Sequence, residues 1–256
     1  MEFDAVVVAA GSSTRFGGRD KLFADLAGRP VLAWSLAAFE ATPGLHCLVV
    51  VSVPDRVAEM TELAEAWCPR ACFRVVEGGA RRRDSVEAGL RQCSTRYVAI
   101  HDGARPLLTP ELLGRVLTAA EGKPGAIAAT RVTDTIKEVS GNTIVAHPDR
   151  ARLWAAQTPQ VVLRQAWLDA AAMGDNDETD DAAMLSRLGL ECEVVEAGAE
   201  NLKITRPLDL DVAERTRYSR LPLCTGGDLD QTLGVVHIKD LYALRIKART
   251  GMDLVS

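Results

Sequence analysis

The chain has 256 residues, of which 47% are hydrophobic and 25% charged, and its formal net charge is −5. This composition is typical of one ordinary globular domain with a small addition, large enough to bury a sizeable core. The negative charge excludes a global electrostatic attraction to nucleic acid or anionic membranes, so an anionic substrate must meet local positive charge. The one dense basic run is Arg81-Arg82-Arg83.

Neither a targeting segment nor a membrane span is predicted. The amino terminus passes from Met1 directly into an apolar run without a basic leader, and no apolar stretch approaches the length of a membrane-spanning helix. Six cysteines are scattered without paired metal-ligand spacing, which is typical of reduced intracellular thiols. We therefore expect a cytoplasmic protein with no membrane partner and no nucleic-acid partner.

The first predicted element is a buried strand over residues 6–8 that runs into the small residues 9–11. A β-branched run bounded by glycine predicts a central parallel strand, and open α/β sheets bind ligands at the carboxyl ends of such strands. Small side chains let backbone amides approach phosphates, and Arg15 and Lys21 add positive charge. The loop lacks the Gly-Lys-Ser/Thr ending of a P-loop and the G-x-G-x-x-G of a dinucleotide fold, which excludes those two site types.

Helices and strands alternate over the following residues. The spacing of apolar residues predicts helices over 29–39, 54–67 and 82–92, and strands over 47–53, 71–77 and 97–101. This alternation predicts an α/β fold, a Rossmann-like, mostly parallel sheet with helices on both faces.

The pattern changes near residue 126. Short strands are predicted over 126–132, 135–139 and 143–146, around the turn sequence Ser140-Gly141-Asn142. Such a hairpin arm often reaches a neighbouring subunit. A helix over 163–173, a strand over 192–195 and a final helix over 209–217 complete the predicted domain.

Asp102 follows the strand over 97–101, which places it at the same sheet edge as the loop over 9–11. An aspartate there can hold Mg²⁺ on a triphosphate. The pattern equally allows Asp102 to cap the next turn and pair with Arg105. We interpret His101 as a packed or hydrogen-bonded residue at the strand end rather than a catalyst. Further along, Thr158-Pro159 has the composition of an ordinary loop or turn.

Taken in chain order, the polar segments resemble the 2-C-methyl-D-erythritol 4-phosphate cytidylyltransferase family, from about residue 4 to residue 217. The most specific matches are Ala9-Ala10-Gly11 with Arg15 and Lys21, His101-Asp102-Gly103-Ala104-Arg105-Pro106, Asp134-Thr135-Ile136-Lys137, Arg150, Gln157-Thr158-Pro159-Gln160, Thr179-Asp180-Asp181 and Asn201-Leu202-Lys203-Ile204-Thr205. The resemblance implies a nucleotidyltransferase of the non-mevalonate isoprenoid pathway. It would transfer a cytidylyl group from CTP to methylerythritol phosphate, release pyrophosphate, and act as a homodimer.

The resemblance also implies roles for individual residues. Those that would contact CTP are Ala9, Ala10, Gly11, Gly79, Ala80 and Ser85. The catalytic cations would be Arg15, Lys21, Arg150 and Lys203, with Asp102 holding Mg²⁺. Those around methylerythritol phosphate would be Arg105, Thr135, Thr158 and Thr179. Thr135 and Arg150 lie on the arm, about residues 133–157, which the family lends to its dimer partner.

Four positions depart from the family pattern. Ser13 stands where a second glycine is usual, Leu22 replaces a glutamine, and Ala80 occupies a position that is often acidic. Asp20 replaces a proline, and its negative charge beside Lys21 is expected to lower phosphate affinity.

The resemblance ends before residue 219, so the sequence predicts a catalytic domain over 1–218 and an extension over 219–256. The extension resembles the first part of a cystathionine-β-synthase-type module, and it is too short to bury a core of its own. It is either a regulatory appendage, vestigial or completed by a dimer partner, or a packed or loose carboxyl-terminal segment.

Two other functions stay open from the sequence. A cytidylyltransferase acting on ribitol 5-phosphate would share the nucleotide half, although Thr179-Asp180-Asp181 and Asn201-Leu202-Lys203 favour methylerythritol phosphate. A nucleotide-sensing protein without turnover would explain the departures near Lys21 and the extension, but the other charged site residues are present.

Overall fold

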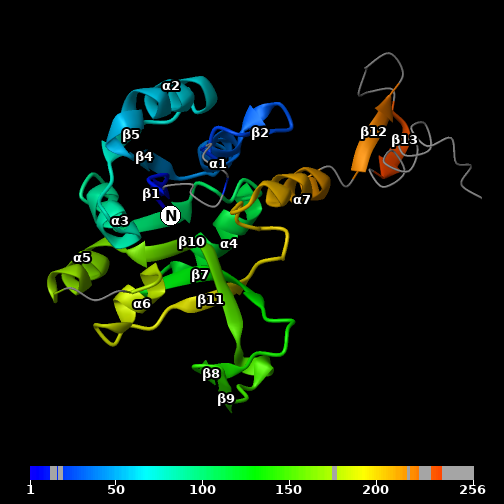
Figure 1. Ribbon diagram of the computed structural model, residues 1–256. Helices are drawn as coiled ribbons and strands as arrows, with labels where there is room; N and C mark the ends of the chain where they lie inside the picture. The colour runs from blue at the N-terminus through cyan, green and yellow to red at the C-terminus, as the bar shows by residue number, and fades with distance from the viewer. Residues whose placement is uncertain (12–15, 17–19, 175–177, 218–219, 225–231, 238–256) are drawn as a thin grey trace, which may run out of the picture.

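The computed structural model describes residues 1–11, 16, 20–174, 178–217, 220–224 and 232–237 (Figure 1). A seven-stranded sheet in the order β11-β7-β10-β6-β1-β4-β5 forms its centre. The strands are β1 (Phe3–Val8), β4 (Leu45–Ser52), β5 (Phe73–Glu77), β6 (Tyr97–Asp102), β7 (Gly125–Arg131), β10 (Trp154–Leu163) and β11 (Glu193–Glu196). β10 runs antiparallel to β6 and β7, and the other neighbouring strands pair in parallel. The predicted mostly parallel sheet is confirmed.

Helices cover both faces of the sheet. One face carries α1 (Val31–Glu40), α2 (Val57–Trp67) and α4 (Pro110–Ala120), and the other carries α3 (Arg82–Leu90), α5 (Arg164–Ala172) and α6 (Asp181–Ser186). In β1, Ala5 and Val7 join the core on the first face and Val6 joins the core on the second. Because side chains of a strand alternate between faces, a strand buried on both sides needs an uninterrupted apolar run.

Smaller elements lie outside this sheet. They are the short pair β2 (Asp25–Leu26) and β3 (Arg29–Pro30), the 3-10 turns η2 (Pro54–Arg56) and η3 (Arg150–Arg152), α7 (Pro207–Arg217), and the pair β12 (Arg220–Cys224) and β13 (Thr232–His237). The predicted helix over 54–67 is therefore divided into η2 and α2. Within the described residues, no helix combines the length and the apolar content that crossing a bilayer requires.

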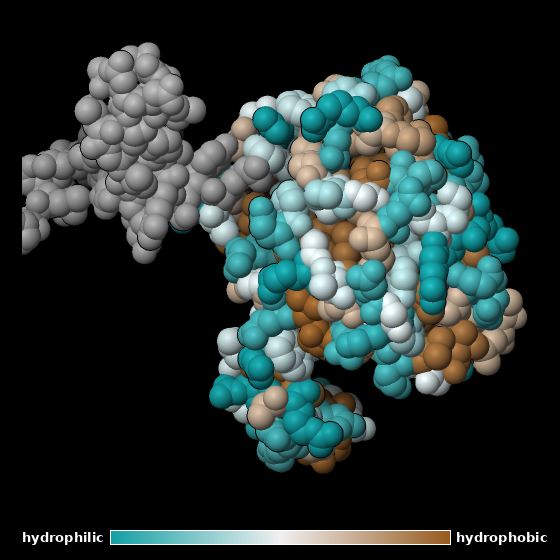
Figure 2. Space-filling view, turned by 180° about the vertical axis from the view of Figure 1, so that it is seen from behind, coloured by the Kyte–Doolittle hydropathy of each residue, from teal (hydrophilic) through white to brown (hydrophobic). Residues whose placement is uncertain are grey.

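The arm contains the hairpin β8 (Glu138–Ser140) and β9 (Thr143–Ala146). Figure 1 shows it projecting beyond β7 and β10, and Figure 2 shows it as a separate lobe of the surface. The prediction of a strand from residue 135 is wrong in its first half, because residues 135–137 form no strand. Pairing ends where Glu138 meets Ala146, so the residues before Glu138 have no partner strand in the hairpin.

The interpretation of Thr158-Pro159 as part of an ordinary loop or turn is wrong. Both residues lie inside β10, a central strand of the sheet. The pairing of β10 with β7 shifts register between Ala156 and Gln160. Proline is tolerated within a sheet at such an irregularity, because the ladder of hydrogen bonds is already interrupted there.

Candidate active site

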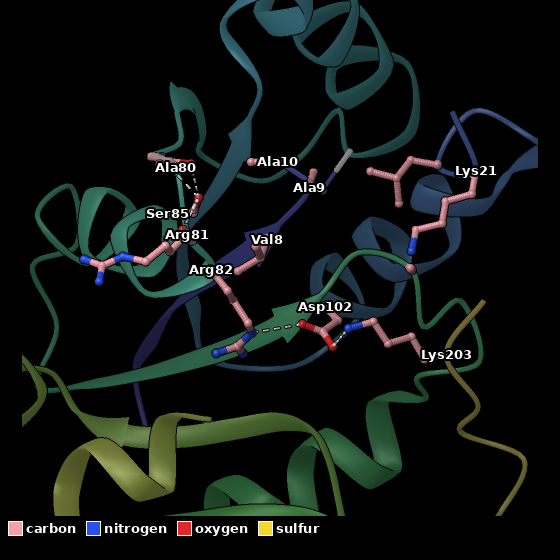
Figure 3. Close-up of a pocket in the computed structure, with 14 residues that line it drawn as sticks. Val8, Ala9, Ala10, Lys21, Ala80, Arg81, Arg82, Ser85, Asp102 and Lys203 are labelled. Carbon is pink, nitrogen blue, oxygen red and sulfur yellow. Dashed lines mark hydrogen bonds and ion pairs between the residues drawn. The ribbon is translucent and has the colours of Figure 1, made fainter. Parts of the chain in front are cut away.

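A cavity of about 350 Å³ opens at the carboxyl edge of β1 and β6 (Figure 3). Its lining consists of Val8, Ala9, Ala10, Gly11, Lys21, Leu22, Gly79, Ala80, Arg81, Arg82, Ser85, Asp102, Ala104 and Lys203. Backbone hydrogen bonds fix this edge, since the Ala9 amide donates to the Val51 carbonyl at 2.7 Å and the Gly103 amide donates to the Val8 carbonyl at 3.0 Å. The chain thus brings the loop after β1 and the end of β6 to one site, as expected for ligand sites of open α/β sheets.

One wall of the cavity requires glycine. A Cβ placed on Gly78 would lie 2.7 Å from both the Ala10 Cβ and the Ser85 Oγ. The Gly79 amide donates to the Ser85 Oγ at 3.2 Å, which ties the loop after β5 to the first turn of α3. Backbone amides and a helix amino terminus therefore meet beside Ala10, an arrangement suited to an anionic ligand.

The Asp102 carboxylate is surrounded by cations. Lys203 Nζ lies 2.7 Å from Oδ2, Arg82 Nε lies 3.4 Å from Oδ1, and Arg105 Nε lies 3.8 Å from Oδ2. Burial by itself raises the pKa of Asp102, but the three cations outweigh it and hold that pKa well below its usual range. Asp102 is thus a fixed negative charge at neutral pH.

Arg82 is a site residue that the sequence analysis did not single out. Its Nη2 donates to Asp181 Oδ2 at 2.8 Å, and Trp167 Nε1 donates to the other oxygen of Asp181 at 3.1 Å. Burial by itself lowers the pKa of Arg82, but the charges of Asp181 and Asp102 raise it by a larger amount, so the guanidinium stays charged. Asp181 is 99 residues away along the chain. No local pattern in Arg81-Arg82-Arg83 distinguishes this half-buried arginine from its two neighbours.

A chain of hydrogen bonds runs behind Asp102. The Asp102 amide donates to Thr158 Oγ1 at 3.0 Å, and Thr158 Oγ1 lies 3.0 Å from His101 Nδ1. His101 Nε2 lies 3.2 Å from the Arg105 carbonyl, which can only accept. His101 is therefore neutral with its proton on Nε2, and Thr158 donates to Nδ1. The interpretation of His101 as a hydrogen-bonded residue at the strand end is confirmed.

Neutral His101 predicts a pH-dependent stability. Burial lowers the pKa of His101 to about 4, whereas an unfolded histidine titrates near ~6.5. Between these values the unfolded chain binds a proton that the folded chain does not, so stability falls as pH falls from about 6.5 to 4. We expect a loss of roughly 2 kcal/mol between pH 7.5 and 4.5, measured by urea denaturation.

A His101→Gln variant tests the assignment of this effect. Its unfolding free energy should lose most of this pH slope whatever its absolute stability, while His147→Gln, an exposed histidine on the arm, should keep the slope. An unchanged slope in His101→Gln would contradict a neutral buried His101.

Asp20 does not stand as an unbalanced charge beside Lys21. Its Oδ2 accepts from Arg56 Nη1 at 2.9 Å, and its Oδ1 accepts from the Leu22 amide at 3.0 Å. This pairing reduces the repulsion that was expected between Asp20 and a bound phosphate. Lys21 itself extends toward the cavity (Figure 3). Arg15 and Ser13 lie outside the described residues.

The structure separates the expected site residues into three groups. Those that line the cavity are Ala9, Ala10, Gly11, Lys21, Gly79, Ala80, Ser85, Asp102 and Lys203. Arg105 and Thr158 lie behind Asp102 instead, where Arg105 Nη1 donates to the Asn201 carbonyl at 2.7 Å. Thr135, Arg150 and Thr179 are exposed and do not line the cavity in one copy of the chain, and Arg150 Nη1 donates to the Thr133 carbonyl at 2.6 Å.

The donor set fits a metal that arrives with a nucleotide. Among the described residues, Asp102 is the one carboxylate in the cavity lining, and no group of three or more His, Cys, Asp or Glu gathers elsewhere. One carboxylate already engaged by Lys203 and Arg82 is too weak a site for a free ion. Mg²⁺ commonly binds through one or two carboxylates together with substrate phosphates, which matches this arrangement.

Comparisons with known proteins agree on one family. A family model described as 2-C-methyl-D-erythritol 4-phosphate cytidylyltransferase matches residues 3–217. Proteins of that name from Prochlorococcus marinus (strain MIT 9313) and Cereibacter sphaeroides are 45% and 41% identical over 218 and 222 residues, covering 82% and 84% of this chain and 95% and 96% of theirs. The crystal structure of that name from Thermus thermophilus is 31% identical, with a TM-score of 0.67 and coverage of 85% of this chain and 100% of the other.

Proposed function

Because the chain belongs to the 2-C-methyl-D-erythritol 4-phosphate cytidylyltransferase family, it transfers the cytidylyl group of CTP to 2-C-methyl-D-erythritol 4-phosphate, and we propose that the cavity around Asp102 is the site of this reaction. One observation carries the proposal: Arg82 and Lys203 pair with Asp102 at the carboxyl edge of the sheet, and Lys21 lines the same cavity. Both substrates are polyanions, so a cavity lined by cations suits them.

The reaction joins two groups that repel each other. A phosphate oxygen of methylerythritol phosphate attacks the α-phosphorus of CTP in line, and pyrophosphate leaves without a covalent enzyme intermediate. The nucleophile is already anionic, so a general base would contribute little. Positioning and fixed positive charge lower the barrier instead, because charge builds on the α-phosphate and the leaving oxygen.

Each cation has a proposed part in this step. Lys21 and Arg15 hold the leaving pyrophosphate, and Lys203 and the Arg150 of a partner subunit hold the incoming phosphate. Arg82, fixed by Asp181, keeps Asp102 in place at the centre of the site. Because Arg82 and Asp102 are held in place before substrate binds, they need little reorganisation during the reaction.

We propose that Asp102 holds Mg²⁺ when CTP is bound. The bound ion would neutralise phosphate charge. Lys203 and Arg82 each bond one oxygen of the Asp102 carboxylate, and each oxygen keeps a further lone pair with which Asp102 would hold the ion. Lys203, with 39% of its side chain exposed, has the room to move toward the incoming phosphate.

A homodimer would complete the site. Thr135 and Arg150 are on the projecting arm, so they would serve the cavity of a partner subunit. The arm exposes Val139, Ile144 and Val145, each more than half exposed, and Val139 pairs directly with Ile144. A two-stranded hairpin is barely stable alone, so an apolar surface here favours burial against another chain.

Placing a charge on this surface tests the dimer. We expect Ile144→Asp to turn a dimer into a monomer in sedimentation velocity and to lower turnover, because Thr135 and Arg150 leave the partner's cavity. Met173→Asp, at an exposed apolar residue outside the arm, should change neither. A wild-type chain that is monomeric at full turnover would contradict the proposed arm exchange.

We also propose that residues 1–218 are the catalytic unit and that 219–256 are an extension beyond it. The family match ends at residue 217, and relatives are covered over more than nine-tenths of their length without the extension. A cytoplasmic location fits the unpaired thiols of the described cysteines.

Pyrophosphate release with CTP and Mg²⁺ tests the function directly. We expect release with methylerythritol phosphate and not with ribitol 5-phosphate, and equal rates from the full chain and from residues 1–218. Pyrophosphate release with ribitol 5-phosphate but not with methylerythritol phosphate would assign a different acceptor. No release with either acceptor would indicate a binding protein. A faster or slower truncated chain would give the extension a regulatory role.

A further inference from the structure

Two cysteines face each other at the amino ends of β4 and β5, at the sheet edge opposite the candidate active site. The Sγ atoms of Cys47 and Cys72 are 2.9 Å apart, within hydrogen-bonding distance. The Leu48 amide donates to the Cys72 carbonyl at 2.8 Å, and the next pair along the two parallel strands is Leu48 opposite Phe73. Backbone pairing therefore fixes the two thiols as cross-strand neighbours.

The backbone spacing suits a covalent bond between these thiols. Neighbouring strands lie about 4.8 Å apart, and the Cα atoms of a disulfide are usually separated by about 4.4–6.8 Å. Cys47 and Cys72 thus meet the distance requirement without a rearrangement of the sheet. Both side chains already lie on the same face of the strand pair, because their sulfur atoms are in contact.

The two thiols differ in accessibility. Cys72 is exposed, whereas Cys47 is 4% exposed and faces the protein interior. Burial and the hydrogen bond to Cys72 raise the pKa of Cys47 to about 12. A reagent in solution therefore meets Cys72 first, and Cys47 is placed to react second. Part of the rise in the pKa of Cys47 is caused by the Cys72 thiol. This part ends once Cys72 has formed a mixed disulfide.

We propose that Cys47 and Cys72 are a dithiol modification site that low-molecular-weight disulfides, such as oxidised glutathione, convert into an intramolecular disulfide. The Cys72 thiolate attacks one sulfur of the reagent, and the first small thiolate leaves. The Cys47 thiolate then attacks the Cys72 sulfur and the second small thiolate leaves. Two cysteine thiols are oxidised, one reagent disulfide is reduced to two thiols, and the two cysteine protons pass to those thiols.

Neighbouring thiols do not compete in this geometry. Cys93 is 5% exposed and its Sγ donates to the Gly89 carbonyl at 3.4 Å, and Cys68 is fully buried with its Sγ directed at the Leu36 carbonyl, 3.9 Å away. Burial raises the pKa of each to about 12. Both thiols therefore have backbone partners of their own, whereas the Cys47 and Cys72 sulfur atoms contact each other.

The bond would reinforce the edge of the sheet without entering the active site. It would close a loop of 25 positions that contains α2 and would tie the edge strand β5 to β4. Such a link reduces the number of conformations open to the unfolded chain, and the resulting stabilisation of the folded state grows with loop length. Since the cavity lies at the opposite ends of these strands, we expect kcat/KM to change by less than about twofold.

Oxidation of the full chain tests the proposal. The reduced protein is incubated with oxidised glutathione, and linked peptides are identified by mass spectrometry. The wild-type chain should lose two thiols and give a Cys47–Cys72 peptide without retained glutathione. Cys47→Ser should keep glutathione on Cys72, because no second thiol displaces it. Cys192→Ser, which removes a partly exposed cysteine elsewhere, should behave as wild type.

A melting experiment on the same samples provides the second readout. The oxidised wild-type chain should melt roughly 5–10 °C above the reduced chain, and a dithiol reductant should reverse the change. Glutathione retained on Cys72 in the wild-type chain, a link between Cys47 and Cys93, or an unreactive Cys72 would each overturn the proposal. A Cys47–Cys72 bond that lowers the melting temperature would overturn the reinforcement of the sheet edge.

Discussion

Lys21→Ala should lower kcat by roughly 10²-fold or more in the pyrophosphate-release assay. Lys21 extends into the cavity from the segment that follows β1, where we place the pyrophosphate of CTP (Figure 3). Charge that develops on the leaving pyrophosphate has to be stabilised in the transition state, and removing one such cation commonly costs about 3–4 kcal/mol. The effect should appear mainly in kcat, since the charge grows as the bond breaks.

Three controls separate this effect from a loss of structure. Lys123→Ala removes a lysine that pairs with Glu193 at the surface, 2.8 Å apart, and should leave turnover unchanged because exposed ion pairs contribute little. Lys21→Arg should recover part of the rate, since the positive charge returns. Equal melting temperatures of wild type and Lys21→Ala would exclude misfolding. Near-normal turnover in folded Lys21→Ala would remove Lys21 from the proposed mechanism.

The central sheet could be predicted from the sequence because its strands are buried on both faces. Such strands have uninterrupted apolar runs, as in residues 47–53, and the alternation of these runs with helices indicates an α/β fold. Helix α4 went unpredicted although its signals are present. Thr109 caps it by accepting from the Leu112 amide, Pro110 opens it, and Leu112, Val116 and Ala120 are spaced along one face.

Other features have no local signal. β10 contains Thr158-Pro159, and its register shift with β7 depends on neighbours far away in the chain. In the sequence Arg82 is one of three consecutive arginines, and only the fold pairs it with Asp181. Most residues of the candidate site could be predicted from the order of the polar segments along the chain. That order identifies residues but gives no distances between their side chains. The placement of Thr158 behind Asp102 depends on a hydrogen bond across 56 residues, which only the folded chain supplies.

Asp102→Asn should lower both turnover and stability, and the two losses should be separable. The substitution keeps the shape of the side chain but removes the charge that Lys203, Arg82 and Arg105 share. Lys203 and Arg82 are partly exposed, and a hydrogen bond to a charged group commonly contributes about 1.5–3 kcal/mol, so we expect a loss of stability of that order. Turnover should fall by roughly 10³-fold, because the proposed ligand of Mg²⁺ is lost together with the fixed charge.

The pH dependence of the stability loss has a definite sign. The pKa of Asp102 is held below its unfolded value, so its contribution to stability is complete above about pH 4 and is lost as pH falls through the folded pKa. The unfolding free energies of wild type and Asp102→Asn should therefore differ fully at pH 7 and converge in strong acid. A difference that is independent of pH would contradict the proposed charge effect.

A double-mutant cycle with Lys203 separates structure from chemistry. Lys203→Met removes the cation nearest to Asp102, so Asp102→Asn combined with Lys203→Met leaves less uncompensated charge than Asp102→Asn alone. The double variant should recover part of the melting temperature and none of the turnover. Recovered turnover would mean that Asp102 acts only by balancing Lys203. Because the double variant lacks both the proposed metal ligand and the proposed phosphate-binding cation, we expect it to bind CTP without completing the transfer.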